Sequence, residues 1–184
     1  MKLHILGTVG YHPNDRRQTS SYFFPQCGIA LDAGSGFYRA FPLIQTPDLH
    51  VLLSHSHLDH VIGLTFVWNA YRSNVLQHIH VWAEQDKIDA INNHLLDLQI
   101  FPAPPKLQWH AIQPGDSWTL GTSKIQAFRL QHPGEALGFK ILSDGKTFAY
   151  VSDTNAQPHE PYWETVRDVD LLLHECNFRA DESE

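Results

Sequence analysis

The chain has 184 residues, of which 42% are apolar, and it carries a formal charge of −7. This length and apolar content suit one core of ordinary size, so we expect a single domain over 1–184. The acidic balance argues against a generally basic nucleic-acid-binding surface. No apolar run approaches the ~20 residues of a membrane span, and the start lacks the apolar core of a signal peptide. Two cysteines, Cys27 and Cys176, are too few for a disulfide framework, and we expect a cytoplasmic protein.

The first half of the chain predicts short strands and one clear helix. Strands are predicted at 3–7 and 28–34, each ended by a glycine, and the polar segment 8–25 between them is predicted to be a loop. An apolar strand follows at 51–53, and 61–71 has the spacing of a helix packed on a sheet. The residues between this strand and this helix therefore form a strand-to-helix turn.

The second half is richer in strand-like segments. In chain order, its pattern predicts a strand at 79–83, a helix at 85–98, a proline-rich stop at 101–105, a strand at 107–112, a hairpin within 117–130, strands at 139–142 and 147–151, a helix at 158–166 and a strand at 169–173. Together with the first half, this is a mixed α/β chain.

The turn after the strand at 51–53 carries the most informative residues. Within six positions it places His55, His57, Asp59 and His60, which are nitrogen and oxygen ligands suited to Zn²⁺ or a similar divalent ion. In extended backbone His55 and His57 share a face and can bind one ion, while the kinked continuation turns Asp59 and His60 toward a second. Four further histidines lie in ordinary predicted elements and are interpreted as surface or core-edge residues: His78, His80, His94 and His110.

This turn, in its strand-to-helix setting, resembles the His-x-His-x-Asp-His hallmark of the metallo-β-lactamase superfamily. The resemblance implies an αβ/βα sandwich of two mixed β-sheets with outer helices and the metal loops on one edge. It also implies a metal-dependent hydrolase that uses a metal-bound hydroxide as nucleophile. Leu31 to Gly34 is similar to a family motif whose aspartate, here Asp32, supports the metal loop without binding metal. An acceptor for turn amides is the alternative role of Asp32.

Two later positions match further ligands of the family. His132 follows a strand-like segment in a Pro/Gly-rich loop, and Asp153 ends a strand in Tyr-x-Ser-Asp-Thr, which resembles the site of the bridging aspartate. The resemblance thus implies two divalent ions, Zn²⁺ or Mn²⁺: one held by His55, His57, His132 and Asp153, the other by Asp59, His60 and Asp153. A simple helix cap is the alternative interpretation of Asp153.

The end of the sequence resembles the family less closely. His174 and Glu175 open a His-Glu-Cys-Asn segment similar to the His-Glu-Ala-Thr motif of ribonuclease Z, whose histidine and glutamate assist proton transfer; a capped strand end is the alternative. Related sequences continue into a Gly-His-Ser segment that carries a last metal histidine, and this segment is absent before Glu184. We therefore expect either a longer natural protein or a second metal site that is weak, rich in water or completed by another group.

These residues favour hydrolysis of phosphodiesters, with Asp59, His174 and Glu175 as candidate catalytic residues. We expect a small phosphodiester or nucleotide substrate, with RNA as an alternative and a homodimer left open. A ribonuclease Z-type tRNA 3′ endonuclease is the second hypothesis, although little room for its long Gly/Pro-rich arm exists between His132 and Asp153. A catalytically weakened metal-binding or scaffold domain is the third. Arg16 and Arg17 could grip a phosphate, but a solvated surface is the favoured interpretation.

Overall fold

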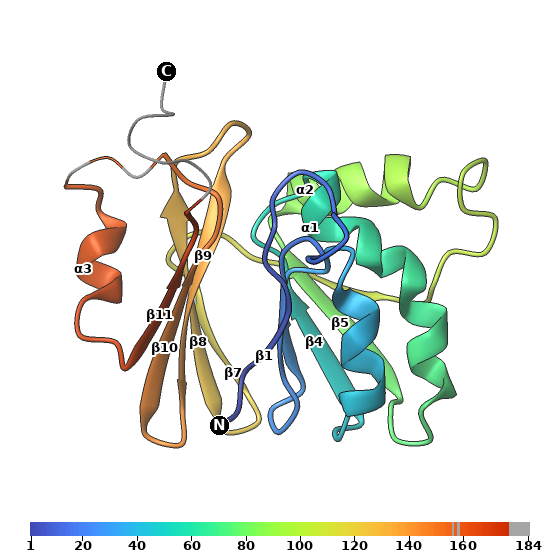
Figure 1. Ribbon diagram of the computed structural model, residues 1–184, viewed down its shortest axis with the longest axis horizontal. Coiled ribbons are helices and arrows are strands. Elements are labelled where there is room, and N and C mark those ends of the chain that lie inside the picture. Colours follow the sequence, from blue (N-terminus) through green and yellow to red (C-terminus); the bar gives the residue numbers. More distant parts are fainter. Residues whose placement is uncertain (156, 158, 177–184) are drawn as a thin grey trace.

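The computed structural model describes residues 1–155, 157 and 159–176. Two β-sheets face each other in the centre of the molecule, and helices cover the outer face of each sheet (Figure 1). Each sheet combines parallel with antiparallel pairs. The αβ/βα sandwich of two mixed sheets that the sequence implied is therefore confirmed.

The first sheet has six strands in the order β1-β2-β3-β4-β5-β6. Their bounds are β1 His4–Gly7, β2 Ser21–Phe24, β3 Ile29–Leu31, β4 Asp48–Leu52, β5 His78–Ala83 and β6 Gln108–Ala111. The pairs β1–β2 and β2–β3 are antiparallel, whereas β3 to β6 run parallel. The parallel strands consequently end at the same edge of the sheet, from which the histidine-rich turn leaves β4.

The second sheet has five strands in the order β11-β10-β9-β8-β7. Their bounds are β7 Ser117–Leu120, β8 Ser123–Leu130, β9 Ala136–Ser143, β10 Lys146–Val151 and β11 Leu171–His174. Neighbours are antiparallel except β10 and β11, which are parallel. His132 lies in the turn from β8 to β9, and Asp153 follows the end of β10, so both face the edge where β4 ends.

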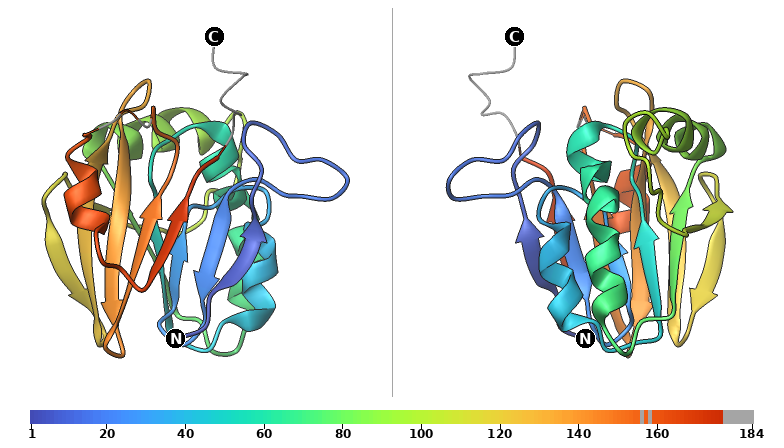
Figure 2. Two further views of the ribbon diagram at one scale, coloured as in Figure 1. Left: turned by 60° about the vertical axis from the view of Figure 1, so that its left-hand side comes forward. Right: turned by 90° about the vertical axis from the view of Figure 1, so that its right-hand side faces the viewer.

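Among the described residues, six helical segments complete the fold: the 3-10 helix η1 Phe37–Leu43, α1 Leu58–Val61, the 3-10 helix η2 Ile62–Arg72, α2 Gln85–Ala90, the π-helix η3 Ile91–Leu95 and α3 Tyr162–Val166. Figure 2 shows η1 and η2 on the outer side of the first sheet and α3 on the outer side of the second. No helix in the part of the chain that the structure describes is long and apolar enough to cross a membrane.

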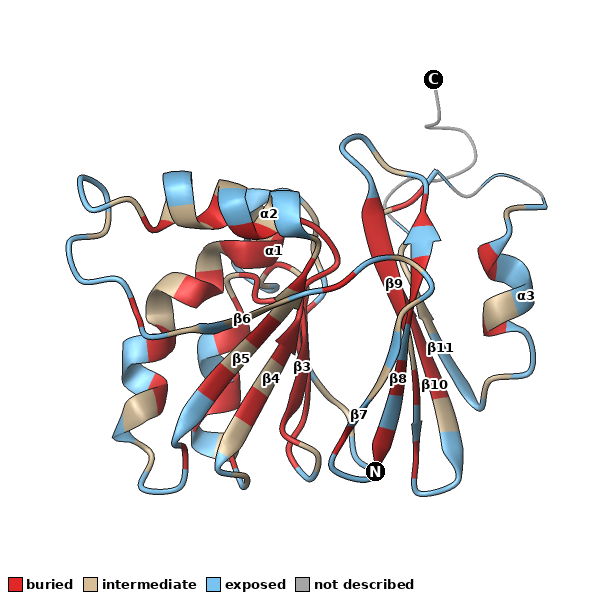
Figure 3. Ribbon diagram, turned by 180° about the vertical axis from the view of Figure 1, so that it is seen from behind, coloured by how far each residue is buried: buried red, intermediate tan, exposed pale blue. Residues whose placement is uncertain are grey.

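Three apolar layers hold these elements together. Leu49 and Val51 of β4 point to the helices over the first sheet, whereas Leu52 points to the second sheet. The layer between the sheets contains large, almost fully buried rings such as Phe139 and Phe148. Because both faces of the sheet are covered, β3 is buried along its whole length, whereas in β4 and β5 buried residues alternate with more exposed ones (Figure 3).

Several element boundaries differ from the sequence prediction. The loop predicted over 8–25 contains β2, whose four residues are all buried, so no alternation of apolar and polar residues marks it. The helix predicted at 85–98 is α2 continued by the π-helix η3, and it ends at Leu95. The helix predicted at 158–166 begins only at Tyr162, because residues 159–161 form a turn; position 158 lies outside the described residues. The 3-10 helix η1 was not predicted; it is short and contains Pro42.

Candidate metal centre

Asp32 supports the histidine-rich turn through hydrogen bonds. Its side chain is fully buried, and its backbone just after β3 is in the left-handed conformation (φ 53°). It accepts hydrogen bonds from the Ser54 amide (2.7 Å) and the Ser54 hydroxyl (2.8 Å), and it lies 2.8 Å from Nδ1 of His60. The supporting role that the resemblance implied for Asp32 is therefore confirmed, and its hydrogen bonds go to the metal loop instead of to amides of its own turn.

The second sheet joins the same buried network. The Tyr150 hydroxyl donates to Asp32 at 2.6 Å, and the Ser152 hydroxyl donates to Ser54 Oγ at 2.9 Å. Ser54 Oγ in turn lies 2.9 Å from Nδ1 of His55. Burial and the neighbouring Asp32 raise the pKa of Tyr150 well above its ordinary value, so its hydroxyl stays protonated and can donate. This network fixes one ring nitrogen of His55 and one of His60, and leaves the other nitrogen of each ring free to bind an ion.

Close packing of glycine backbone brings the turn near β3. The Gly63 amide donates to the carbonyl of Ala33 at 2.7 Å, and the Ala33 amide donates to the carbonyl of His60 at 2.8 Å. A Cβ atom at Gly63 would overlap the carbonyl of Gly34. A Cβ atom at Gly34 would likewise overlap the carbonyl of Asp59. Glycine at positions 34 and 63 therefore allows the loop to approach the strand that precedes Asp32.

Two groups of side chains on this edge have the spacing of a metal site. One group contains His55, His57 and His132, and the other contains His55, His60 and Asp153; within each group the ligand atoms lie within 4.8 Å of one another. Nε2 of His132 lies 3.1 Å from Nδ1 of His57. The first group is a set of three imidazoles, which suits Zn²⁺, and the second mixes nitrogen with oxygen. Asp153 thus lies with His55 and His60, and His55 belongs to both groups.

The buried ring nitrogens fit a bound cation. Nε2 of His55 and Nε2 of His60 have no hydrogen-bond partner among the described residues, although both are buried. Burial, and then the neighbouring His60, lowers the pKa of His55 to about 3, so this imidazole is neutral and offers its lone pair. Burial alone would lower the pKa of His60, but Asp32 and the carboxylates of Asp153 and Asp59 raise it well above its ordinary value. This acidic surrounding stabilises positive charge where a metal ion would sit.

Asp59 lies at the rim of the second group. Its Oδ2 is 3.4 Å from Nε2 of His60 and accepts a hydrogen bond of 2.8 Å from the Tyr11 amide. Burial opposes ionisation of Asp59, but the close contact and charge of His60 and the hydrogen bond from the Tyr11 amide together hold its pKa below the ordinary range. The loop between β1 and β2, which extends away from the sheets in Figure 2, is therefore attached to this edge through Asp59.

The loop that carries His132 is held to the first sheet by charged side chains. Lys87 of α2 donates to the carbonyl of Gly134 at 2.7 Å, and the Glu135 amide donates to the carbonyl of His132 at 2.8 Å. Arg129 lies between Glu84, at 3.2 Å, and Glu135. We call Glu84, Lys87, Arg129 and Glu135 the charged clamp. It joins the start of α2 to the turn between β8 and β9, across the edge that holds the candidate ligands.

His174 and Glu175 lie next to Asp153 but have partners of their own. A Glu175 carboxylate oxygen accepts from the Thr154 amide at 2.8 Å, which fixes the residue after Asp153. Nε2 of His174 lies 3.0 Å from the Tyr162 hydroxyl, and its Nδ1 lies 2.8 Å from the carbonyl of Glu175. His174, Glu175 and Asp153 also line one pocket of about 240 Å³. Asn177, the last residue of the predicted motif, lies outside the described residues.

The two arginines of the β1–β2 loop differ in position. Both are exposed, and their backbone amides donate to the side chain of Asn14. Arg17 lines the 240 Å³ pocket together with Asp153 and Glu175. The structure thus brings all six predicted metal ligands, His174, Glu175 and Arg17 to one edge.

Sequence reasoning assigned no function to three residues of this edge. Ser54, Tyr150 and Ser152 complete the buried network, yet each looks like an ordinary strand-end residue in the sequence. The only signals were the position of Ser54 directly before His55 and the Tyr-x-Ser-Asp-Thr strand end, to which Tyr150 and Ser152 belong. The amide of Tyr11 gave no signal, since any residue there carries one.

A family model described as a β-lactamase superfamily domain matches residues 29–184. The chain belongs to the metallo-β-lactamase superfamily. It is 27% identical over 192 residues to the probable metallo-hydrolase YhfI of Bacillus subtilis, covering 99% of this chain and 75% of that protein. The crystal structure of YhfI superposes with a TM-score of 0.79 at 22% identity, covering 98% of this chain and 73% of that one.

Two further relatives have more specific names. A ribonuclease Z of Pyrobaculum calidifontis is 27% identical over 217 residues, with 98% of this chain and 75% of the relative covered. A 3′,5′-cyclic-nucleotide phosphodiesterase of Candida albicans is 25% identical over 154 residues, with 79% of this chain and 35% of the relative covered. These relatives support a metal-dependent hydrolase, and the fold together with the ligand groups supports divalent metal binding.

Proposed function

We propose that this protein is a metal-dependent phosphodiesterase that acts on a small phosphodiester or nucleotide. The observation that carries the proposal is the pair of ligand groups that share His55 across the two sheets. Beside them opens a cavity of about 530 Å³, lined among others by Tyr11, His132 and Asp153, which is large enough for a small-molecule substrate. The phosphodiesterase and ribonuclease Z relatives both point to phosphodiesters rather than to amides.

His55, His57 and His132 would hold one ion, and His60 with Asp153 would hold a second, with Asp59 at its rim. Zn²⁺ is the proposed ion and Mn²⁺ the alternative. When bound, such ions polarise phosphoryl oxygens and acidify water. The protein's own contribution is to keep His55 neutral, to surround His60 with carboxylates and to fix both rings through Ser54 and Asp32. A location in the cytoplasm and a homodimer remain predictions from the sequence.

The test is hydrolysis of bis(p-nitrophenyl) phosphate. We expect turnover that Zn²⁺ or Mn²⁺ stimulates and a chelator removes, and we expect His57→Ala to abolish it while the far-ultraviolet circular dichroism spectrum stays unchanged. His78→Ala is a suitable control, since His78 is exposed on β5 and belongs to neither ligand group. Turnover of a β-lactam or a thioester without any phosphodiester cleavage would refute the proposal.

Cleavage of precursor tRNA and metal analysis separate the other two hypotheses. A ribonuclease Z-type activity is supported by the Pyrobaculum relative, but β8 and β9 are joined by only a short turn, with no arm to hold tRNA. We therefore expect precursor tRNA to be cut poorly compared with small diesters; efficient, site-specific cleavage would favour the endonuclease. Absence of bound metal and of turnover would favour the scaffold domain.

His174 is proposed to assist proton transfer to the leaving oxygen, with Glu175 positioning the segment after Asp153. Burial raises the pKa of Tyr162, so its hydroxyl stays protonated and only positions the ring of His174. His174 is partly exposed, so a proton that it gives up is replaced from water. General acid catalysis typically contributes ~10²- to 10⁴-fold. His174→Ala should slow diesters with alkyl leaving groups by about this range and barely change release of p-nitrophenolate, which leaves without a proton. Equal slowing of both substrates would end the proton-transfer assignment.

A further inference from the structure

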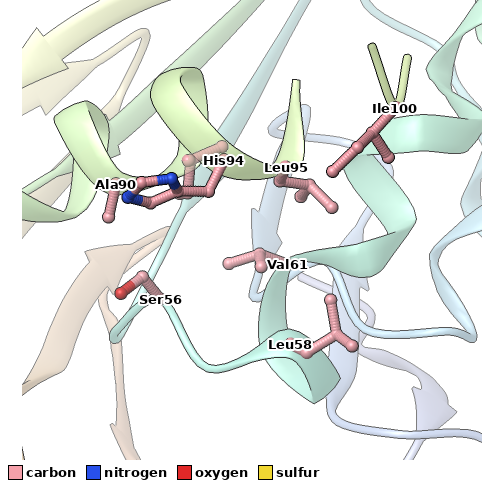
Figure 4. Close-up of a pocket in the computed structure, with 8 residues that line it drawn as sticks. Ser56, Leu58, Val61, Ala90, His94, Leu95 and Ile100 are labelled. Atoms are coloured by element: carbon pink, nitrogen blue, oxygen red, sulfur yellow. The ribbon is translucent and has the colours of Figure 1, made fainter. Parts of the chain in front are cut away.

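A cavity of about 350 Å³ lies between the loop that carries His55 to His60, the metal loop, and segment 90–100 (Figure 4). Most of its wall is apolar and consists of Leu58, Val61, Ile91, Leu95 and Ile100. Two residues of this wall, Leu58 and Ile100, are 62% and 71% exposed. The fold therefore leaves large apolar side chains uncovered around a hollow of small-molecule size.

Two polar side chains stand on one side of this apolar cavity. In Figure 4, Ser56 on the metal loop and His94 on η3 both lie at the left of the cavity, and Ile100 lies at its right. Within the part of the chain that the structure describes, neither the Ser56 hydroxyl nor the His94 ring has a hydrogen-bond partner. The cavity thus offers apolar surface on most sides and hydrogen-bonding groups on one.

The cavity wall includes both chain neighbours of a candidate metal ligand. Ser56 and Leu58 flank His57, which is exposed and belongs to the three-imidazole group. The cavity therefore borders the segment that carries this ligand. Its opposite wall comes from the π-helix η3, in which the Leu96 amide donates to the carbonyl of Ile91 at 2.9 Å. Such wide turns are rare and frequently occur at functional sites.

We propose that this cavity is a subsite for a heteroaromatic ring, a nucleobase, of the phosphodiester whose phosphoryl group lies at the metal centre. The assignment rests on the proposed phosphodiesterase function for the phosphoryl part. A nucleobase has apolar faces and a hydrogen-bonding edge, which matches the apolar wall and the Ser56–His94 side. A helix or strand of another protein would need a long groove, because protein–protein interfaces bury far more surface than a single cavity of this size provides.

Nucleoside binding tests the subsite without any hydrolysis. In the full chain, adenosine should shift the methyl resonances of Ile91, Leu95 and Ile100 saturably, and ribose should not. Ala90→Trp fills the cavity and should abolish the shifts, whereas Asn93→Trp places the same ring on the exposed side of η3 and should leave them. Unshifted methyl groups, or the same shifts in Ala90→Trp, would overturn the proposal.

The polar side distinguishes a nucleobase from a merely apolar ligand. Ser56→Ala and His94→Phe remove one hydrogen-bonding group each with little change of volume, and each should weaken adenosine binding by about three- to tenfold. Toluene, which has no polar edge, should bind both variants as it binds the unmodified protein. Unchanged adenosine affinity in both variants would rule out recognition of the base edge.

Kinetics then connect the subsite with the metal centre. The unmodified protein should prefer thymidine 5′-(p-nitrophenyl phosphate) over methyl p-nitrophenyl phosphate, and Ala90→Trp should lower this preference by about tenfold without slowing the methyl ester. An unchanged preference would overturn the proposal. If neither ester is hydrolysed while adenosine still binds, the phosphodiesterase function fails and the nucleoside subsite stands.

Discussion

The two sheets contribute to the candidate metal centre in different ways. The first sheet provides a continuous turn with His55 and His60, which are 2% and 0% exposed and are fixed by hydrogen bonds from buried groups. The second sheet provides His132 and Asp153, each from a separate loop and each only partly buried. The first side is therefore part of the core, so that damage there should reduce stability, whereas damage on the second side should mainly reduce metal binding.

The supports of the two sides also differ in chemistry. Asp32 supports the ligands of the first sheet from a fully buried position, where a polar group without a hydrogen-bond partner lowers stability. The charged clamp supports the second sheet's ligands partly from the surface: the side chains of Arg129 and Glu135 are 41% and 65% exposed, whereas those of Glu84 and Lys87 are largely buried. Exposed ion pairs contribute little to stability but can still orient a loop.

Asp32→Ala should give the largest effect. It removes the acceptor of the Ser54, His60 and Tyr150 groups inside the core, and loss of one partner of such a buried pair costs about 3–5 kcal/mol. Urea-induced unfolding measures this loss directly. Asp32→Asn, which keeps one acceptor and the volume, should lose less.

Asp170 is the matched control on the second sheet. It also accepts several hydrogen bonds, from Lys146 and from the amide and hydroxyl of Thr147, but it is exposed. Asp170→Ala should therefore lower the free energy of unfolding far less than Asp32→Ala. Equal losses would contradict the contrast between a buried and an exposed support.

The next effect concerns metal occupancy. Asp153 belongs to a ligand group with His55 and His60, whereas Asp59 stands at its rim and is already held by the Tyr11 amide. Asp153→Ala should therefore lower the number of ions bound per chain more than Asp59→Ala does, with little change in the free energy of unfolding. Metal analysis after dialysis measures both. Equal or smaller losses for Asp153→Ala would favour its alternative role as a helix cap.

The charged clamp should have a moderate effect on one ligand group. Lys87→Met removes the hydrogen bond to Gly134 and loosens the loop that carries His132, so Zn²⁺ affinity of the three-imidazole group should fall by about tenfold. Competition with a coloured chelator measures the affinity. Lys124→Met, an exposed lysine of β8 outside the clamp, is the control and should change nothing. The clamp has no positioning role if both variants bind Zn²⁺ equally well.

The sequence predicted the parts of this edge that are encoded locally. The turn at His55 to His60 is contiguous, and Asp32, His132 and Asp153 each follow a recognisable strand, so their gathering could be anticipated from the fold family. The network of Tyr150, Ser152 and Ser54 could not be anticipated. Its hydrogen bonds join positions 98 to 118 residues apart, and such pairing depends on how the two sheets face each other.

Secondary structure was missed for physical reasons that differ from case to case. The strand β2 is buried on both faces and shows no alternation, so its sequence looks like the end of a loop. The helix expected over 85–98 changes to a π-helix at Ile91, where the wider turn departs from the regular 3.6-residue pattern. The cavity beside η3 could not be derived from periodicity, because periodicity describes the direction of side chains and not the space between elements.

The smallest effect is expected far from the metal ligands, on the inner face of the first sheet. His50 of β4 stacks on His80 with ring centroids 4.7 Å apart, and Asp48, His110 and Trp82 also face it. Burial, and then the charge of His80, lowers the pKa of His50 from 6.5 to about 4. The unfolded chain therefore takes up a proton below pH 6.5 that the folded chain resists until about pH 4.

Stability should consequently be unaffected by His50 above pH 6.5 and should fall as the pH decreases from 6.5 to about 4. Because His50 is only partly buried, the loss is on the order of 1 kcal/mol after allowance for solvent screening. His50→Gln keeps an acceptor for the Trp82 indole but cannot be protonated, so its free energy of unfolding should decrease less over this range. Urea unfolding of both proteins at pH 7.5, 5.5 and 4.5 isolates this difference, since all other acid-titrating groups are shared. Parallel pH profiles would show that His50 is protonated as easily in the folded as in the unfolded chain, and that the inner face of the first sheet tolerates charge far better than the buried surroundings of Asp32.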